Sequence, residues 1–352
     1  RIGFELYNKI LTDVLSNKQG EVLAEEKEKA SVVFSGPAFI DESYMPLVQD
    51  RLSFYQKISK VMPEIEWSIH APYIHRINQL KKEKNAIVLA HNYQTPEIYH
   101  GISDVAADSL ALAIEAAKTK ADIIVMAGVH FMAETSKLMS PEKKVLLPDM
   151  DAGCSLSSSV TGKDVRLLKE KYPGVPVVSY VNTSADVKAE TDICCTSANA
   201  VKIVESLGVK KVIFLPDDYL AKYVASQTHV EIIAWKGICM VHDQFNEKEI
   251  HDIRKKNPGI KIIAHPECPP DVIKASDFAG STGGMIKYVE DNQPKKVMMV
   301  TECSMSDNIQ IENPNVQFVR PCNLCPYMKK ITLNKIYDCL KNEVNEVKIS
   351  HN

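Results

Sequence analysis

The feature that most constrains the fold is an internal repeat: one unit occurs three times, with a period of roughly 85 to 90 residues. Each copy begins with a short apolar run that ends in a polar side chain. His91 follows the first run, Tyr180 the second and His265 the third, at intervals of 89 and 85 residues. Runs of Val, Ile and Leu bounded by turn residues are typical of buried parallel strands.

Two further landmarks recur in the same order. In each copy an acidic residue is followed five positions later by a hydroxyl, which we expect to open a helix. These pairs are Asp104 with Ser109, Asp192 with Ser197, and Asp277 with Thr282. A later strand in every copy runs into a cysteine. These cysteines are Cys154, Cys239 and Cys325. Strands alone would recur in any α/β protein, but agreement of strand end, acid, hydroxyl and cysteine indicates a true repeat.

Strands that alternate with helical segments predict βαβ units and a parallel sheet. We therefore expect an α/β fold of three homologous three-layer α/β/α domains, with short parallel sheets around a pseudo-threefold axis. The expected parts are a helical N-terminal extension over 1–75, repeats over 80–160, 161–243 and 244–335, and a C-terminal tail over 336–352. Ligands bind at the carboxyl ends of strands in such sheets, so the landmark side chains should face one central cavity.

Composition excludes several classes of protein. Hydrophobic residues make up 45% and charged residues 25% of the chain, as in globular proteins. A net charge of −3 without a long basic tract gives no general attraction for nucleic acid or an anionic membrane. No apolar run approaches the roughly 18 residues of a membrane helix, and the amino-terminal stretch lacks the apolar core of a secretory signal. We therefore expect a cytoplasmic protein.

The nine cysteines are an odd number in a long chain without an export signal, which disfavours a disulfide framework. Three thiolates, one from each repeat, would bind an iron–sulfur cluster and leave one iron open as a Lewis acid. Cys154 and Cys239 closely follow a glycine, which suits a bulky cluster. Cys325 forms a CxxC pair with Cys322, its nearest rival as a ligand, and spacing alone leaves zinc as an alternative to iron.

Polar groups at the strand ends and helix starts predict the substrate and the chemistry. Ser109, Ser197 and Thr282 would each be ordinary caps alone, but three helix starts facing one cavity indicate a small substrate with two or three anionic groups. Several titratable groups at different angles suit a reaction with several proton transfers. These groups are His91, Tyr93, Tyr180, His265 and Glu267. We expect Glu267 to be the general base, whereas His242 is either a partner of the metal site or an ordinary histidine.

Eight motifs, in order, resemble the quinolinate synthase family. They are AHNYQ, ADSLALA, GVHFMAETSKLMSPEKKVLLPDMDAGCSL, SYVNTSADVKAETDICCTSANA, AWKGICMVH, AHPECP, FAGSTGG and CNLCPYMKK. The resemblance covers about residues 70–340. It implies condensation of iminoaspartate with dihydroxyacetone phosphate to quinolinate, with loss of phosphate and water, in the de novo synthesis of NAD. It also implies an aspartate oxidase as the source of iminoaspartate and a candidate partner.

The resemblance implies a 4Fe–4S cluster that acts as a Lewis acid and is bound by Cys154, Cys239 and Cys325. It places a further set of side chains around the substrate. These are His91, Tyr93, Ser109, Tyr180, Asn182, Ser197, His265, Glu267 and Thr282. Tyr93 and Glu267 would take the acid–base roles, while Asn182 and the three hydroxyls would hold carboxylates or phosphate. Some members carry three cysteines near the last ligand, but this chain has two, so thiol–disulfide regulation is not carried over.

Two other functions stay open on the residues alone. A hydro-lyase would use the same open iron to eliminate water from one small dicarboxylate. A non-enzymatic iron–sulfur sensor would need neither an enclosed cavity of acid–base groups nor Glu267.

Overall fold

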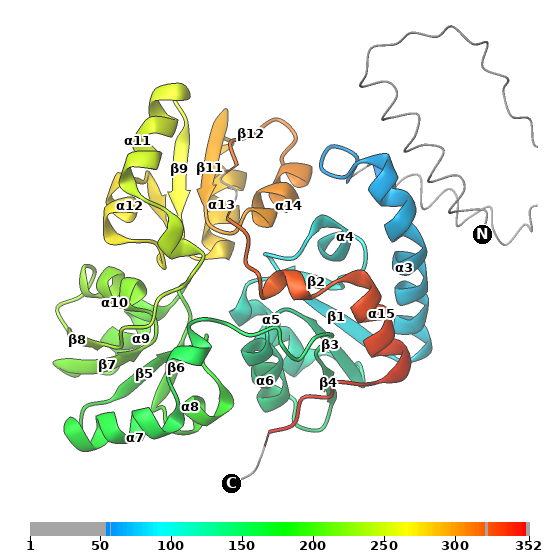
Figure 1. Cartoon of the computed structure of the whole chain (residues 1–352). Helices are drawn as coiled ribbons and strands as arrows, with labels where there is room; N and C mark the ends of the chain where they lie inside the picture. The colour runs from blue at the N-terminus through cyan, green and yellow to red at the C-terminus, as the bar shows by residue number, and fades with distance from the viewer. Residues whose placement is uncertain (1–53, 57, 321–322, 350–352) are drawn as a thin grey trace, which may run out of the picture. The chain divides into compact units, whose positions relative to one another are not determined.

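The computed structural model describes residues 54–56, 58–320 and 323–349. Three parallel sheets of four strands each form its framework, grouped around a shared centre (Figure 1). The first sheet has the order β2-β1-β3-β4, and the other two have the same order, β6-β5-β7-β8 and β10-β9-β11-β12. The predicted α/β class with three homologous units is therefore confirmed. Residues 1–53, which make up most of the expected N-terminal extension, lie outside the described residues.

Each sheet is built from four short strands. The strands of the first are β1 (Ala86–His91), β2 (Val105–Ala107), β3 (Ile123–Ala127) and β4 (Lys144–Leu146). Those of the second are β5 (Val177–Tyr180), β6 (Ile193–Cys195), β7 (Lys211–Leu215) and β8 (Glu231–Ala234). Those of the third are β9 (Lys261–Ala264), β10 (Phe278–Ala279), β11 (Lys296–Val300) and β12 (Gln317–Phe318).

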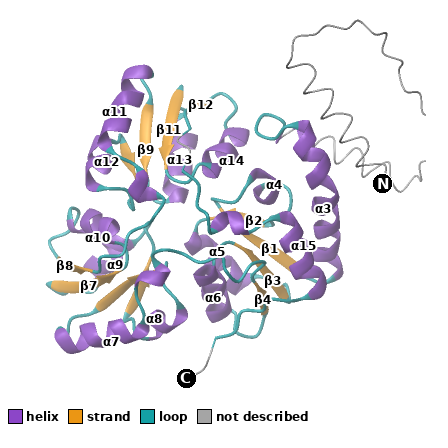
Figure 2. Ribbon diagram, in the orientation of Figure 1, coloured by secondary structure: helices purple, strands orange, loops and turns teal. Residues whose placement is uncertain are grey.

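Helices pack on the sheets (Figure 2). The first unit has α3 (Glu64–Glu83), α4 (Pro96–Tyr99), α5 (Ser109–Lys118) and α6 (His130–Met139). The second has η1 (Ser157–Ser159), α7 (Gly162–Lys171), α8 (Ala185–Ala189), α9 (Ala200–Ser206) and α10 (Asp218–Ala225). The third has η2 (His242–Gln244), α11 (Glu247–Lys256), α12 (Pro270–Ala275), α13 (Thr282–Asn292) and α14 (Ser304–Glu312), followed by η3 (Met328–Lys330) and α15 (Leu333–Asn342).

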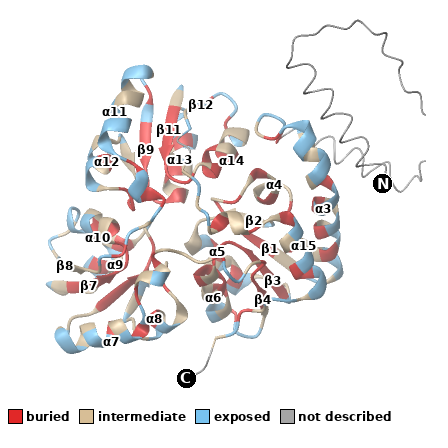
Figure 3. Ribbon diagram, viewed as in Figure 1, coloured by how far each residue is buried: buried red, intermediate tan, exposed pale blue. Residues whose placement is uncertain are grey.

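The sheets are covered on both faces, which explains their continuous apolar sequences. In β11, Met298 and Val300 belong to one buried cluster, whereas Val297 and Met299 belong to another on the opposite side. Successive side chains of a strand point to opposite faces, so each sheet is the middle of three layers. Burial is accordingly concentrated on the strands and on the helix faces turned toward them (Figure 3).

The repeated acids hold the start of the second strand in each sheet. Each aspartate accepts a hydrogen bond from a backbone N–H of the first strand and donates its own N–H to the carbonyl of the same residue. The pairs are Asp104 with Val88, Asp192 with Val177 and Asp277 with Ile262, each with an Oδ2–N distance of 2.8 Å. The acids are therefore structural, and their equivalence shows that the repeat reaches the level of single hydrogen bonds.

The ends of the expected first unit differ from the sequence-based boundaries. Helix α3 runs through residue 75 to Glu83 and packs on β1, so its last half belongs to the core rather than to an extension. Its buried residues include Ile77 and Leu80. Helix α15 lies beside α3 and buries Ile336 and Leu340, so the expected C-terminal tail contains core structure (Figure 1). Both helices supply the apolar cover that the first sheet needs on its second face.

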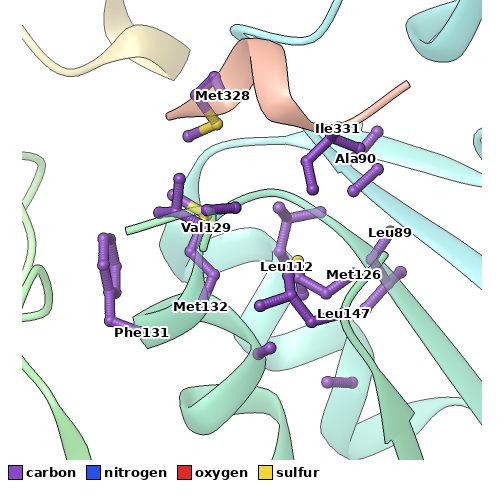
Figure 4. Packing of buried hydrophobic residues seen from close by; sticks show 14 of the residues in the cluster. Leu89, Ala90, Leu112, Met126, Val129, Phe131, Met132, Leu147, Met328 and Ile331 are labelled. Atoms are coloured by element: carbon purple, nitrogen blue, oxygen red, sulfur yellow. The ribbon is translucent and has the colours of Figure 1, made fainter. Parts of the chain in front are cut away.

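The last loop of the third unit also packs on the first. Met328 and Ile331 contact the cluster that surrounds β1 and β3 (Figure 4). Leu112 of α5 and Met126 of β3 lie in the same cluster. The segment that follows Cys325 is thus anchored to the first sheet, and this anchor holds the third cysteine loop near the other two.

Glu343 ties the C-terminal segment to the first unit and should make its stability depend on pH. Its carboxylate lies 2.6 Å from both Lys144 Nζ and Lys84 Nζ. The hydrogen bond from Lys144, followed by that from Lys84, lowers the pKa of Glu343 from 4.5 to about 2. A depressed folded-state pKa gives stability that is complete above the unfolded pKa and is lost as the pH falls toward the folded one.

We expect Glu343→Gln to lower the midpoint of thermal unfolding by roughly 2 °C at pH 7, a modest amount because the pair is partly exposed. The difference from wild type should shrink as the pH falls from about 4.5 toward 2. Asp338→Asn, which changes an exposed acid of the preceding helix α15, is the control. A difference that stays constant with pH in thermal scans would contradict the assignment.

Candidate active site

The carboxyl ends of the strands meet at one cavity, whose empty space is about 740 Å³ when the open solvent at its mouth is counted. All the side chains that the sequence placed at the site line this cavity. They are His91, Tyr93, Ser109, Cys154, Tyr180, Asn182, Ser197, Cys239, His265, Glu267, Thr282 and Cys325. They come from all three units, because His91, Tyr180 and His265 stand at the ends of equivalent strands.

The three cysteines occupy equivalent backbone positions. Each lies three residues before a short 3₁₀ helix. Its carbonyl accepts a hydrogen bond from the N–H of the residue four positions later. The donors are Ser158 for Cys154 at 3.0 Å, Asp243 for Cys239 at 3.0 Å and Lys329 for Cys325 at 3.1 Å. The equivalence extends the repeat to the cysteine loops and supports Cys325 as the third member. Cys322, its rival, lies outside the described residues.

Two opposing effects act on the pKa of each thiol, namely burial and hydrogen bonds from backbone amides. Burial raises the pKa of Cys154 to about 12, and it raises the pKa values of Cys239 and Cys325 above their ordinary value. In every copy the N–H groups two and three residues later hydrogen-bond the sulfur and oppose this rise. Cys154 is close enough to the other two for their charges to repel. Three soft donors facing one space, each supported by amides, fit a thiolate-bound metal group.

The acid–base groups form one chain of hydrogen bonds across the three units. Tyr180 Oη donates to Glu267 Oε1 at 2.6 Å, and Glu267 Oε2 lies 3.0 Å from His242 Nδ1. His242 Nε2 then lies 2.9 Å from Thr301 Oγ1, which in turn lies 2.6 Å from Tyr93 Oη. Glu267, His242 and Thr301 are buried. The chain links the two residues expected to act as acid and base.

His242 and Thr301 extend the set predicted from the sequence. The sequence left open whether His242 is a partner of the metal site or an ordinary histidine. In the structure His242 is buried, with 1% exposure, and it belongs to the chain of hydrogen bonds just described. Its Nδ1 also lies 3.1 Å from Cys239 Sγ. Cys239, His242 and Glu267 therefore form a possible set of metal donors, although their mutual hydrogen bonds already satisfy them. Thr301 directly follows β11, so its position at a strand end is the sequence signal that could have identified it as a site residue.

Two histidines at equivalent positions share one tautomer. The N–H of Tyr93 donates to His91 Nδ1 at 3.2 Å, and that of Glu267 donates to His265 Nδ1 at 3.4 Å. Since Nδ1 accepts in both, the hydrogen bonds assign the proton to Nε2, which is then a donor. Burial lowers the pKa of His91 to about 3 and that of His265 to about 4, so both are neutral at pH 7.

Glu267 is a carboxylate at neutral pH. Burial alone would raise its pKa, but the positive charge that His265 gains at low pH and the hydrogen bonds from His242 and Tyr180 outweigh burial and lower it. Tyr180 and Tyr93 behave oppositely, because burial followed by the negative charge of Glu267 raises their pKa values. The cavity therefore holds one negatively charged carboxylate beside two protonated phenols.

The hydroxyl positions differ among the units. Ser109 and Thr282 are the first residues of α5 and α13, as expected, and the neighbouring Asp108 and Ser281 are the actual caps. The expectation that Ser197 opens a helix is wrong, because α9 begins at Ala200.

The reason lies in the turn before α9. Asn199 Oδ1 accepts the N–H of Thr196 at 2.7 Å and shapes this turn ahead of the helix. Ser197 instead places its Oγ 3.3 Å from His265 Nε2, in the third unit. It therefore still contributes a hydroxyl to the cavity.

The first and third units approach each other at Gly283. A Cβ built on this glycine would lie 2.9 Å from Asp108 Oδ2, closer than real Cβ atoms come. Beside it, Asn92 Nδ2 donates to Thr282 Oγ1 at 3.0 Å. The backbone of α13 therefore comes close to a side chain of the first unit, and a Cβ at this position would have to displace the carboxylate of Asp108.

Fold and site together define an α/β enzyme of three repeated units whose central cavity combines thiols, histidines, a carboxylate and phenols. No helix among the described residues is long and apolar enough to cross a membrane. The family model for "Quinolinate synthetase A protein" matches residues 75–352. The chain belongs to this family, which confirms the resemblance found in the motifs.

Curated relatives agree with this assignment. A protein of Sinorhizobium fredii named quinolinate synthase is 59% identical over 308 residues, which cover 87% of this chain and 86% of the relative. Proteins of the same name from Caulobacter vibrioides and Xylella fastidiosa are each 58% identical, over 299 and 276 residues. These matches cover 84% and 78% of this chain, and 82% and 81% of the relatives.

Proposed function

We propose that this chain is a quinolinate synthase of de novo NAD biosynthesis. Its substrates are iminoaspartate and dihydroxyacetone phosphate, which condense to quinolinate with loss of phosphate and water. The observation that supports this most directly is the cavity lined by equivalent residues of all three units, in a chain whose named relatives are quinolinate synthases. Together the two substrates carry two carboxylates and one phosphate, which matches three hydroxyl positions from three units.

Cys154, Cys239 and Cys325 would hold a 4Fe–4S cluster. Three protein thiolates leave one iron without a protein ligand, and this iron would supply Lewis-acid chemistry to a substrate oxygen or nitrogen. The free thiols of Cys154, Cys239 and Cys325 support the assignment, since none of the three is in a disulfide. Free thiols also suit a reducing compartment, and on that ground we propose a cytoplasmic location.

The remaining side chains would bind and orient the substrates. Ser109, Ser197 and Thr282 would donate hydroxyl hydrogen bonds to anionic groups, and Asn182 would add amide donors. His91 and His265 would donate from Nε2, as their tautomers require.

Glu267 would remove a proton from carbon or nitrogen, while Tyr93 and Tyr180 would donate protons as hydroxide and phosphate leave. The buried hydrogen-bond chain through His242 and Thr301 would keep these groups in their starting protonation states.

A product assay tests the proposal. Anaerobically purified enzyme should form quinolinate only when both iminoaspartate and dihydroxyacetone phosphate are present, as followed by liquid chromatography with mass spectrometry. Release of water from a single dicarboxylate would instead identify a hydro-lyase. Absence of turnover by enzyme with a full complement of iron and sulfide would favour a sensor. Coupling to an aspartate oxidase stays a prediction, and equal turnover with chemically generated iminoaspartate would contradict direct transfer between the enzymes.

The hydroxyl of Thr301 offers a prediction for the buried chain. Thr301→Val keeps the shape of the side chain but removes the atom that joins His242 to Tyr93. We expect kcat to fall by about tenfold to a hundredfold while KM changes little, because Thr301 does not line the cavity. Loss of one partner also leaves buried polar groups unsatisfied, at a cost of about 1–3 kcal/mol in stability.

Thr135→Val, a partly buried threonine of α6 whose hydroxyl bonds its own helix, is the matched control. Unchanged kcat in Thr301→Val would show that the chain does not serve turnover.

A further inference from the structure

Two buried carboxylates stand behind the cysteine loops, and the function proposed above does not use them. Asp217 follows β7 in the second unit and Glu302 follows β11 in the third, so they occupy equivalent positions 85 residues apart. Both side chains are fully buried, at 0% exposure. Neither lines the central cavity, so neither reaches the substrate space.

Asp217 joins a helix to a cysteine loop. Its Oδ1 accepts the N–H groups of Tyr219 at 2.7 Å and Leu220 at 2.9 Å, and thereby caps α10. Its Oδ2 accepts the N–H of Cys239 at 3.1 Å. One carboxylate thus connects the end of β7, the start of α10 and the backbone of the second cysteine.

Glu302 makes the same connection in the third unit. Its Oε2 accepts the N–H of Ser304 at 2.9 Å at the start of α14, and its Oε1 lies 3.4 Å from the N–H nitrogen of Cys325. Lys329 Nζ lies 3.0 Å from Oε1 and also donates to the carbonyl of Tyr93 at 2.7 Å. This pair therefore links the third cysteine loop to the strand end of the first unit.

The first unit has no such acid. The residues at the end of β3 are Gly128 and Val129, and α6 begins without a side-chain cap. Its cysteine loop is tied instead to the second one, through the residue next to Cys154. Ser155 Oγ accepts the N–H of Met240 at 3.1 Å and donates to the carbonyl of Ile238 at 3.2 Å, so it brackets Cys239 on both sides.

We propose that Asp217 and Glu302 are positioning residues that hold the backbones of Cys239 and Cys325 in a metal-binding arrangement before the metal group arrives. The inference rests on the proposed role of the three cysteines as ligands. Burying a carboxylate is costly, and an apolar side chain would fill the same space without that cost. The hydrogen bonds to the cysteine N–H groups give a reason for two acids at equivalent places. The two acids act through backbone atoms, and they touch neither a cysteine sulfur nor the substrate.

Asp217→Asn separates the two contacts of this residue. Asparagine caps a helix about as well as aspartate, so its oxygen can keep the two N–H groups of α10. Its NH₂ group then faces the N–H of Cys239, where an acceptor stood before. The variant should fold, whereas the cysteine loop loses its support. Asp218→Asn, one residue later, removes a carboxylate that pairs with the exposed Lys222 and is the matched control.

The experiment measures iron and sulfide bound per chain after anaerobic reconstitution, and the rate at which a chelator removes the iron. Loss of an outer hydrogen bond to a metal ligand weakens metal binding by about 10- to 100-fold. We therefore expect Asp217→Asn to release iron roughly tenfold faster than wild type and Asp218→Asn, and to shift the iron–thiolate bands in resonance Raman spectra. The thermal midpoint of the metal-free protein should stay within about 2 °C of wild type.

Glu302→Gln is the second variant and decides the question if Asp217→Asn does not fold. Iron release as slow as in wild type, with unchanged iron–thiolate bands, in whichever of the two variants folds would overturn the positioning role. That result would leave the proposed function intact. Failure of wild type itself to take up iron and sulfide would instead overturn the proposed metal site, and the positioning role with it.

Discussion

Replacing Glu267 by glutamine should abolish nearly all quinolinate formation and leave the bound iron and sulfide unchanged. The carboxylate is the negatively charged group of the Tyr180–Glu267–His242–Thr301–Tyr93 chain, because its pKa lies below its ordinary value. An amide keeps the size of the side chain but has no basicity. Loss of a positioned base lowers turnover by about 10²- to 10⁴-fold.

The hydrogen bonds around Glu267 add to this effect. Tyr180 Oη lies 2.6 Å from Oε1 and His242 Nδ1 lies 3.0 Å from Oε2, so both oxygens act as acceptors. Glutamine has one acceptor and must turn its NH₂ toward one of these partners. We expect the variant to be modestly less stable, by about 1–3 kcal/mol, through that mismatch.

Product formation by Glu267→Gln should be measured together with iron, sulfide and thermal unfolding. Glu249→Gln, which changes an exposed acid of α11, is the control for a general effect of charge removal. Substantial turnover in Glu267→Gln with an intact cluster would show that another group is the base. Lost metal would show that Glu267 supports the metal site instead.

Replacing any one of Cys154, Cys239 and Cys325 by serine should remove the cluster and all activity. A serine hydroxyl is a poor ligand for iron–sulfur iron, and two remaining thiolates from two units do not hold a cluster. The free thiols face one cavity at equivalent positions, so we expect each loss to be as severe as the others. Anaerobic iron and sulfide analysis with visible absorption spectra measures the outcome.

Two controls test the choice of ligands. Cys194→Ser changes an exposed thiol of β6 and should retain the cluster. Cys322→Ser should retain it as well, because Cys325 occupies the repeat position shared with Cys154 and Cys239. Loss of the cluster in Cys322→Ser, together with its retention in Cys325→Ser, would reassign the third ligand.

The parts of the site that could be predicted were those repeated in the sequence. His91 and His265 lie 174 residues apart, yet each is held by the N–H two residues later, so one local rule placed both. The cysteine loops could be predicted in the same way, since each is a local turn after the last strand of its sheet. A local backbone pattern that recurs three times can be recognised without knowing what packs against it.

The contacts between units were not predictable. Thr301 has no equivalent hydroxyl at the matching strand end in the second unit, where Pro216 stands, and its role depends on Tyr93 of another unit. Ser197 has the expected spacing, but a single side chain, Asn199, delays the helix after it. Both outcomes depend on particular neighbours rather than on a periodic pattern.

By itself, the sequence determined the three parallel sheets, their order of elements and the residues at their carboxyl ends, because apolar runs, turns and their spacing act locally along the chain. Only the tertiary structure decided which ends meet. It joined Glu267, His242, Thr301 and Tyr93 into one chain of hydrogen bonds. It also placed α3 and α15 on the first sheet. An apolar sheet face must be covered, and the helices that cover it can come from distant parts of the sequence.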